Sequence, residues 1–281
     1  MTEVLRYAAF TDAGRGGNPA GVVLDAGHLD DAGMLAIAAE VGYSETAFVI
    51  GATGPDHLTV RYFSPRAEVA FCGHATIAAA VALAERSAPG DVVLDTRAGL
   101  VAVRTANEAG GMVATLTSVP TRTRPAPDDV LDAALHALWW DRGDLDPQYP
   151  PHVAYAGNDH LLVPIRSRAT LAALDYDLAA LGAVMADAGW TTVHAFWAQT
   201  PTTFHARDPF PPGGVVEDPA TGAAAAAFGG YLRDLSLVDV PGRVTVLQGA
   251  DMGRPSRLLV DLDAGSTTVR VTGAAGPILG A

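Results

Sequence analysis

Apolar residues along this chain are grouped mostly in short runs, some alternating with polar residues and some continuous. Both patterns predict strands, the first half-buried and the second buried on both faces. The predicted strands cover residues 5–11, 20–24, 46–50, 58–64, 92–96, 101–105, 112–117, 160–163, 193–199, 203–206, 243–248, 257–261 and 268–272. The protein should therefore be rich in strands and contain few helices.

Amphipathic helical spacing is confined to four segments, residues 31–40, 128–140, 169–174 and 177–188. Asp30 is the expected N-cap of the first helix, and Gly42 is expected to end it. Two further helices, over 75–85 and 222–232, are apolar on every face and consist largely of alanine. A helix that is apolar all round is a buried helix, and small side chains let a surrounding sheet come close.

These two buried helices belong to an internal repeat. "RYFSPRAEVAFCGHATIAAAVAL" and "FHARDPFPPGGVVEDPATGAAAAAFGGYL" share an aromatic strand, a loop with proline, an acidic residue and a glycine before the alanine-rich helix. Cys72-Gly73-His74 aligns with Thr221-Gly222-Ala223. The predicted fold is α+β, with two pseudo-symmetric halves, each a curled mixed sheet or barrel around a central apolar helix.

The expected domain boundaries follow from this repeat. The N-terminal half should comprise residues 1–119 and 266–281, because the last predicted strand can return to complete it. The C-terminal half should comprise 120–265, after a linker in the Pro/Thr-rich segment 119–129.

Composition narrows the function. The net charge is −13 and no run of Lys and Arg is present, so we expect neither a nucleic-acid nor a membrane partner. The first residues do not resemble a signal peptide, and the apolar runs are too short to span a bilayer, so a cytoplasmic location is expected. The single cysteine excludes an internal disulfide and a catalytic pair of thiols.

The glycines that precede the buried helices are candidates for anion binding. The first amides of a helix lack intrahelical partners, and the helix dipole places partial positive charge there. Gly73 and Gly222 would let a substrate carboxylate reach these amides. The alternative is that both are ordinary turn glycines.

Four side chains near these helices are candidates for chemistry, each with a simpler explanation. Glu45 precedes an apolar strand and could be a strand-edge residue. Asp218 could be a helix cap. His74 could be a hydrogen-bonded core residue, and Cys72 a small buried apolar residue or a thiol activated by the helix N-terminus. His152, His160, His194 and His205 lack the spacing of a metal motif and are interpreted as structural or surface residues.

The motifs together resemble the PhzF-like family of phenazine biosynthesis, which is similar in fold to diaminopimelate epimerase. The segments that carry the resemblance are "AAFTDAGRGGNPAGVVL", "YSETAFV", "RYFSPRAEVAFCGHATIAAA" and "VVEDPATGAAAAAFGGYL". The resemblance implies two pseudo-symmetric halves with the active site in the cleft between them. It also implies an isomerase without cofactor or metal, whose founding relative acts on a dihydro-hydroxyanthranilate.

The resemblance assigns roles to individual residues. Glu45 in "SET" matches the catalytic glutamate, His74 in "CGH" the active-site histidine, and Asp218 in "EDPATG" the aspartate that holds the substrate. Gly73 and Gly222 match the glycines whose amides bind the substrate carboxylate.

One position departs from the family pattern, which often has serine after "DPATG". Ala223 keeps the backbone amide there and lacks the hydroxyl donor of serine. This difference affects which substrate is expected more than it affects the site itself. Cys72 matches one thiol position of the epimerases, and Thr221 occupies the other, so racemisation by two thiols is excluded. Cys72 and Ala223 are therefore expected to contact the substrate.

These observations predict proton transfer on a small carboxylate, by a double-bond or keto–enol isomerisation. Glu45 would remove a proton and return it at another carbon. The alternatives are an amino- or hydroxy-acid epimerase that uses Glu45 with His74 or Cys72, and a carboxylate-binding protein without catalysis. The family and the pair Trp139–Trp140 suggest a homodimer.

Overall fold

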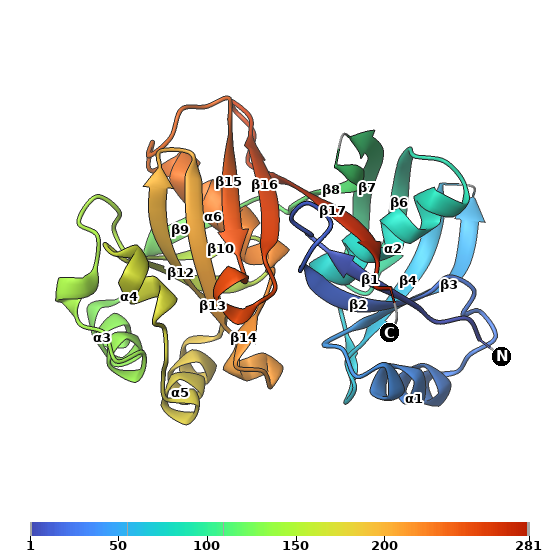
Figure 1. The fold of residues 1–281 in the computed structure, drawn as a ribbon, viewed down its shortest axis with the longest axis horizontal. Coiled ribbons are helices and arrows are strands. Elements are labelled where there is room, and N and C mark those ends of the chain that lie inside the picture. The colour runs from blue at the N-terminus through green and yellow to red at the C-terminus, as the bar shows by residue number, and fades with distance from the viewer. Residues whose placement is uncertain (1, 55, 109, 280–281) are drawn as a thin grey trace. The chain divides into compact units, whose positions relative to one another are not determined.

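The computed structural model describes residues 2–54, 56–108 and 110–279. The chain forms two compact units, and each is described by itself (Figure 1). Unit 1 comprises Met1–Thr117 and Thr272–Ala281, and unit 2 comprises Ser118–Val271. None of the helices in the described ranges is long and apolar enough to cross a bilayer.

Unit 1 is a sheet that closes on itself. Its strands are β1 (Leu5–Ala9), β2 (Asn18–Val23), β3 (Thr46–Gly54), β4 (His57–Phe63), β6 (Asp91–Thr96), β7 (Gly99–Glu108), β8 (Gly111–Thr117) and β17 (Arg270–Pro277). They pair in the order β17-β1-β2-β3-β4-β6-β7-β8, and β8 pairs with β17. The last strand of the chain thus returns to complete the first unit.

Helix α2 (Gly73–Arg86) is the centre of unit 1 and contacts β1, β2, β3, β7 and β8. Its residues from His74 to Ala82 are buried, so the apolar alanine-rich pattern corresponds to a helix enclosed by the barrel. Helix α1 (Asp31–Val41) packs on β3 and β4 from outside. Asp30 caps it through the amide of Gly33, and Gly42 ends it in the left-handed conformation.

Unit 2 repeats the arrangement of unit 1. Its strands are β9 (Arg122–Pro125), β10 (His152–Tyr155), β11 (Asp159–Pro164), β12 (Trp190–Thr200), β13 (Thr203–Pro209), β15 (Gly242–Gln248) and β16 (Ser256–Leu262). They pair in that order, and the sequence of antiparallel and parallel pairings from β9 to β16 is the same as from β17 to β7. Helix α6 (Gly222–Asp234) contacts β9, β10, β11 and β16, as α2 does in its own barrel. The predicted fold class of two pseudo-symmetric α+β halves is confirmed.

The other helices of unit 2 form an outer layer. Helices α3 (Asp128–Ala137), α4 (Arg168–Ala172) and α5 (Leu178–Ala188) bury apolar residues in a cluster with β11 and β12. Short 3-10 turns lie at Arg142–Asp144, Pro211–Gly213 and Ala250–Met252.

Two predictions from sequence need correction here. The segment expected as a linker contains strand β9, which pairs with β10, and neither strand was predicted. Proline at the end of β9 and the few apolar residues in it hid the strand. The helix expected to reach residue 140 ends at Ala137, because Trp139 has a φ of 56°, which a helix cannot include. Trp139 is exposed, whereas Trp140 packs against the core.

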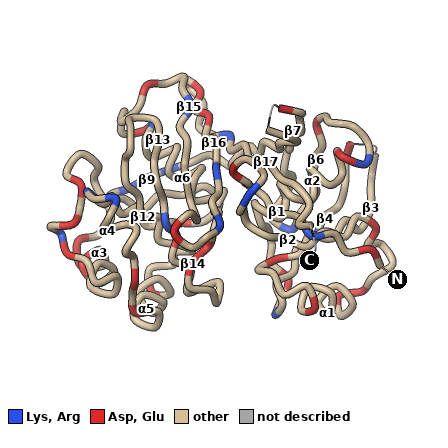
Figure 2. Tube along the Cα trace, viewed as in Figure 1, with Lys and Arg blue, Asp and Glu red and all other residues tan. Residues whose placement is uncertain are grey.

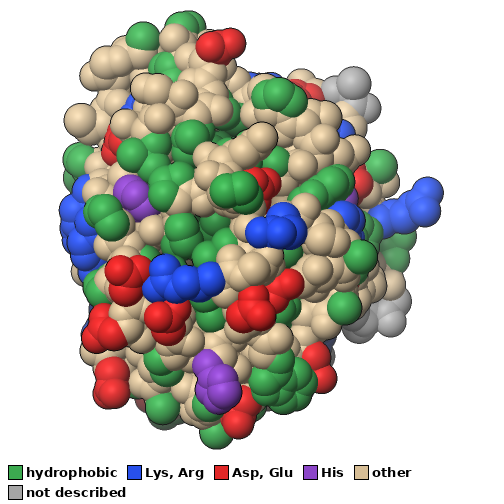
Figure 3. Space-filling model, turned by 90° about the vertical axis from the view of Figure 1, so that its left-hand side faces the viewer, with side chains coloured by type: hydrophobic (Ala, Val, Ile, Leu, Met, Phe, Trp, Pro, Cys, Tyr) green, Lys and Arg blue, Asp and Glu red, His purple; other side chains and the backbone are tan. Residues whose placement is uncertain are grey.

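Acidic residues are spread over both units rather than gathered in one segment (Figure 2). On the face of unit 2 drawn in Figure 3, basic side chains are interspersed with acidic ones. Ion pairs join some of the basic and acidic side chains of unit 2, for example Arg168 and Asp251 at 2.8 Å.

Candidate active site at two helix N-termini

A short hairpin positions the N-terminus of α2. Strand β4 pairs with β5 (Glu68–Val69), with Phe63 opposite Glu68, and α2 begins after Cys72. The side chain of Cys72 makes no capping hydrogen bond to the helix. The first helical hydrogen bond is donated by the amide of Thr76 to the backbone carbonyl of Cys72, at 3.0 Å. The earlier amides of the first turn are therefore available to other partners.

Neither the backbone conformation nor the packing of neighbouring atoms requires glycine at position 73. Gly73 is the first residue of α2 and has no left-handed φ, and a Cβ built there would approach no protein atom closer than Phe71 Cε1 at 4.0 Å. Neither the predicted role in binding nor the alternative of an ordinary turn glycine is decided by these two observations. A residue without a side chain at this place leaves room for a ligand to reach the backbone.

Glu45 is held at the start of β3 by its backbone. The carbonyl of Glu45 accepts a hydrogen bond from the Gly21 amide of β2, at 3.2 Å. A side chain at Gly21 would lie 2.5 Å from the hydroxyl of Thr46, so glycine is needed for this close approach. The strand pair thus fixes the backbone from which the Glu45 side chain extends.

The structure brings together Glu45, Cys72 and His74. The sulfur of Cys72 lies 3.4 Å from Glu45 Oε2 and 3.3 Å from His74 Nδ1. His74 Nε2 lies 3.5 Å from Glu45 Oε2 and 3.4 Å from the hydroxyl of Ser44. The Glu45 side chain is 17% exposed and that of His74 8%, so the cluster lies at the edge of the barrel interior.

The protonation of His74 is set by burial. Burial lowers the pKa of His74, whereas Glu45 and a hydrogen bond with the backbone of Pro19 act in the opposite direction. The imidazole is consequently neutral at neutral pH, with one nitrogen able to accept a proton and the other able to donate one.

The N-terminus of α6 has the same frame and different side chains. Strand β13 pairs with β14 (Glu217–Asp218), with Asp218 opposite Asp208, and α6 begins after Thr221. The Thr221 side chain makes no capping bond and instead donates to Asp218 Oδ2 at 2.6 Å. Asp218 is 8% exposed, and the structure places Gly222 and Ala223 in the first turn of the helix.

Gln248 organises this second helix N-terminus. Its amide nitrogen donates to the Asp218 carbonyl at 2.7 Å and to the Thr221 hydroxyl at 3.1 Å, and its oxygen accepts from the Thr221 amide at 3.1 Å. Gln248 is almost fully buried. Sequence reasoning missed it, because nothing in the last residue of a strand indicates a contact with a loop 27 residues away.

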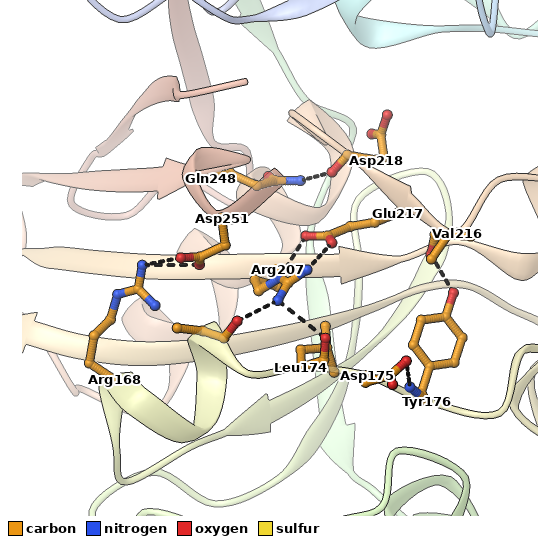
Figure 4. Close-up of polar contacts among 11 residues, drawn as sticks. Arg168, Leu174, Asp175, Tyr176, Arg207, Val216, Glu217, Asp218, Gln248 and Asp251 are labelled. Atoms are coloured by element: carbon orange, nitrogen blue, oxygen red, sulfur yellow. Dashed lines mark hydrogen bonds and ion pairs between the residues drawn. The ribbon is translucent and has the colours of Figure 1, made fainter. Parts of the chain in front are cut away.

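A partly buried ion pair supports each hairpin. In unit 2, Arg207 binds both carboxylate oxygens of Glu217 and also donates to the carbonyls of Ala172 and Leu174 (Figure 4). The neighbouring Asp218 side chain points away from this pair, as expected for adjacent residues of a strand. In unit 1, Arg61 binds both oxygens of Glu68, at 2.7 and 2.6 Å. The acidic residue in both repeat motifs was the available signal for these pairs.

A second buried pair lies beneath the α6 N-terminus. His194 Nδ1 and Asp208 Oδ1 are 2.8 Å apart, and both side chains are fully buried. His160 is also fully buried, with Nδ1 2.7 Å from the Thr192 hydroxyl. Both imidazoles are thus enclosed in unit 2, and the interpretation of these histidines as structural stays a prediction.

One surface hollow in unit 1 does not belong to this site. It is lined by Ile50, Thr59, Val60, Arg61, Asp95, Thr96 and Arg97, and includes none of the predicted site residues. Within the described ranges, the group of side chains arranged to hold a metal ion is Glu45, Cys72 and His74.

Comparison with known proteins identifies the family. The model of the PhzC-PhzF family, described as phenazine biosynthesis-like protein, matches residues 7–280. This chain belongs to that family. The resemblance found in the sequence motifs is therefore confirmed.

Relatives of the family are named as isomerases. A Bacillus subtilis protein named uncharacterized isomerase YfhB is 30% identical, over 97% of this chain and 95% of its own length. The trans-2,3-dihydro-3-hydroxyanthranilate isomerase of Pseudomonas chlororaphis is 31% identical, over 94% of this chain and 93% of its own. The prediction of a PhzF-like isomerase is confirmed at the level of the family.

Solved structures agree with the fold. The crystal structure of a PhzF-family phenazine biosynthesis protein of Bacillus anthracis superposes with a TM-score of 0.87 at 26% identity, covering 99% of this chain and 97% of that one. The roles of Glu45, His74, Asp218 and the helix glycines stay predictions, as does the cleft between the halves.

Proposed function

We propose that this protein catalyses proton transfer between two carbons of a small unsaturated carboxylate, with Glu45 as the base. The observation that carries the proposal is the contact of Glu45 Oε2 with Cys72 and His74 beside the N-terminus of α2. A carboxylate in contact with two groups able to carry protons can give up and regain its own proton within one turnover.

The reaction needs no oxidant or reductant. Glu45 takes a proton from an activated carbon, and the electron pair of the C–H bond moves into the unsaturated system as the double bond shifts. The resulting anion takes the proton back at a different carbon, so substrate and product are isomers. The carboxyl group of the substrate would bind the amides of Gly73 and Gly222, with Asp218 and His74 on its other polar groups.

The placement of the proton-carrying groups favours isomerisation over epimerisation. Inversion at one carbon needs an acid and a base on opposite faces of the substrate. In unit 1 the candidate groups, Glu45, Cys72 and His74, lie within 4.8 Å of one another, which places them on one side of anything bound there. A shift of a proton along one face needs only this cluster.

The substrate class follows from the named relatives. A trans-2,3-dihydro-3-hydroxyanthranilate, or a carboxylate of the same unsaturated type, is the first compound to test, because two Pseudomonas relatives carry that name for their activity. Ala223 removes one donor from the carboxylate site relative to the common family pattern. A related carboxylate with fewer acceptor groups is the second choice.

The test is proton NMR in heavy water with wild type, Glu45→Gln and the exposed control Glu40→Gln. Wild type and Glu40→Gln should exchange and relocate one substrate proton, and Glu45→Gln should not, although all three keep the same melting temperature. Full exchange in Glu45→Gln would refute the assignment. Exchange at one carbon with inversion would identify an epimerase, and ligand-induced stabilisation without exchange would identify a binding protein.

We also propose that the protein forms a homodimer, as expected from the sequence. Trp139 is 63% exposed in unit 2, which is unusual for the largest apolar side chain. Sedimentation of wild type and Trp139→Ser would test it, since a dimer that uses this surface should dissociate in the variant.

A further inference from the structure

Three different metal-binding groups converge in unit 1 at the N-terminus of α2. A thiol sulfur, an imidazole nitrogen and a carboxylate oxygen come from Cys72, His74 and Glu45. Measured between Cys72 Sγ, Glu45 Oε2 and His74 Nε2, the three separations are 3.4, 3.5 and 3.8 Å.

This triangle matches one face of a tetrahedral zinc site. Zinc lies about 2.3 Å from sulfur and about 2.0–2.2 Å from nitrogen or oxygen. In a tetrahedron two nitrogen or oxygen ligands are therefore roughly 3.3–3.6 Å apart, and a sulfur lies roughly 3.5–3.7 Å from either. The separation of Glu45 Oε2 and His74 Nε2 falls in its interval, and the two separations from Cys72 Sγ each differ from theirs by about 0.1 Å. Small rotations of the side chains would close these differences.

The donor set also selects the kind of ion. A set of one sulfur, one nitrogen and one oxygen suits borderline cations such as Zn²⁺ and Co²⁺, whereas Mg²⁺ and Ca²⁺ require oxygen ligands. Three protein ligands leave a fourth position for water or a substrate carboxylate, which is the pattern of exchangeable rather than closed structural sites.

We propose that Glu45, Cys72 and His74 form a site for a borderline divalent cation, which on binding reversibly occupies the proton-transfer groups. Binding releases the thiol proton of Cys72 to solvent and uses the lone pairs of His74 and Glu45. The metal site does not depend on the proposed function. The expected inhibition of proton transfer by the bound cation does rest on the proposed function.

The second helix N-terminus provides an internal comparison. Thr221 and Ala223 occupy the positions of Cys72 and His74, so this place lacks the thiol and the imidazole. One ion per chain is therefore expected at these two places together. Because the chain contains a single cysteine, any thiolate–metal signal reports Cys72.

The experiment is a titration of reduced, chelator-treated protein with Co²⁺, followed by displacement with Zn²⁺. We expect one equivalent of Co²⁺ to produce a thiolate-to-cobalt charge-transfer band together with the intense visible bands of tetrahedral cobalt. Zn²⁺ should remove both, and calorimetry in buffers of different ionisation enthalpy should show proton release.

Three variants distinguish a site with three protein ligands from binding of the ion by the thiolate of Cys72 alone. Cys72→Ser should lose the charge-transfer band, and His74→Gln and Glu45→Gln should each weaken Zn²⁺ binding about tenfold or more, while the exposed control His28→Gln should bind as wild type. Circular dichroism establishes that the variants are folded. The absence of the band in wild type, or a band unaffected by both His74→Gln and Glu45→Gln, would overturn the site.

A separate readout tests the consequence for activity. Zn²⁺ at one equivalent should suppress the deuterium exchange described above, and a chelator should restore it. Metal binding without suppression would overturn the inhibitory role and leave the site in place. Metal binding by a protein that exchanges no substrate proton would instead refute the proposed function, so the two failures are distinguishable.

Discussion

The N-termini of α2 and α6 are built on the same frame and carry different chemistry. In both, an arginine two residues before the end of a long strand, β4 or β13, binds the glutamate of the short strand that pairs with it, β5 or β14. The helix then begins with a glycine five residues after that glutamate. In unit 1 this frame presents Cys72 and His74, which contact Glu45 at the start of β3. In unit 2 it presents Asp218 and Thr221, held by Gln248.

The buried layer beneath the two helices also differs. Tyr62 and Asp208 occupy equivalent positions, opposite the second residue of the short strand. The Tyr62 hydroxyl lies 2.6 Å from that of Thr76 in α2, whereas Asp208 pairs with the imidazole of His194. Unit 1 thus has a neutral layer under a cluster that can transfer protons, and unit 2 has an ionisable layer under a site of hydrogen-bond acceptors.

This difference suggests a division of labour between the units. The common elements set the backbone, and the few positions that vary set the chemistry. Under the proposed function, the groups of unit 1 transfer the proton and those of unit 2 bind polar groups of the substrate.

The strongest test exchanges one carboxylate for its amide in each unit. Glu45→Gln should lower kcat by about 10²–10⁴-fold, the usual contribution of a general base, because the amide cannot accept the proton. Asp218→Asn should chiefly raise KM, since it retains the shape and alters hydrogen bonding. Steady-state kinetics on the identified substrate measures both, and a large fall in kcat for Asp218→Asn with little change for Glu45→Gln would reverse the proposed division.

The second test removes the arginine of each hairpin. Arg207→Met should lower the free energy of unfolding by about 3–5 kcal/mol, because it leaves Glu217, whose side chain is 5% exposed, charged and unpaired. Arg61→Met should cost only about 1–2 kcal/mol, because Arg97 also contacts Glu68, at 2.6 Å. Urea unfolding measures the two values. Equal losses would show that Arg97 does not replace Arg61.

The third test measures how the stability of the protein depends on pH through His160, a buried histidine of unit 2. Burial, with His194 nearby, lowers the pKa of His160 from 6.5 to about 3. Between these values the unfolded chain binds a proton that the folded chain does not, so stability falls as the pH decreases through this window. The loss from His160 approaches about 1.4 kcal/mol per pH unit.

Urea unfolding of wild type, His160→Gln and His28→Gln at pH 7, 6 and 5 would measure this dependence. The slope should decrease in His160→Gln and stay as in wild type in His28→Gln, whose position is exposed. An unchanged slope in His160→Gln would show that the acid sensitivity arises elsewhere.

The smallest effect is expected at Ala223, where this chain differs from the serine that is common in the family. Ala223→Ser should add a hydroxyl donor in the first turn of α6 and tighten binding of a carboxylate by about 0.5–1.5 kcal/mol, which is roughly a two- to tenfold lower KM. The exposed control Ala39→Ser should leave KM unchanged. An increase in KM for Ala223→Ser would mean that the substrate of this protein requires the space that alanine leaves.

Much of this protein follows from local sequence pattern. The two alanine-rich helices were predicted as buried because every face of each is apolar, and most strands were predicted because their periodicity is local. The motifs around Glu45, His74 and Asp218 marked the candidate residues, since each motif is contiguous in the chain. The alignment of Cys72 with Thr221 was likewise available from sequence, because the repeat preserves the order of its parts.

Tertiary structure alone decided the contacts that join distant segments. Strand β9 was hidden in a Pro-rich segment, because it becomes a strand by pairing with β10 rather than by its own propensity. Gln248 holds a loop 27 residues away, and the separations within the Glu45, Cys72 and His74 cluster depend on how β3 and α2 pack. Local pattern determines which side chains are apolar, small or charged, but a hydrogen bond or a metal-sized triangle requires positions accurate to a few tenths of an ångström, and only long-range packing fixes those.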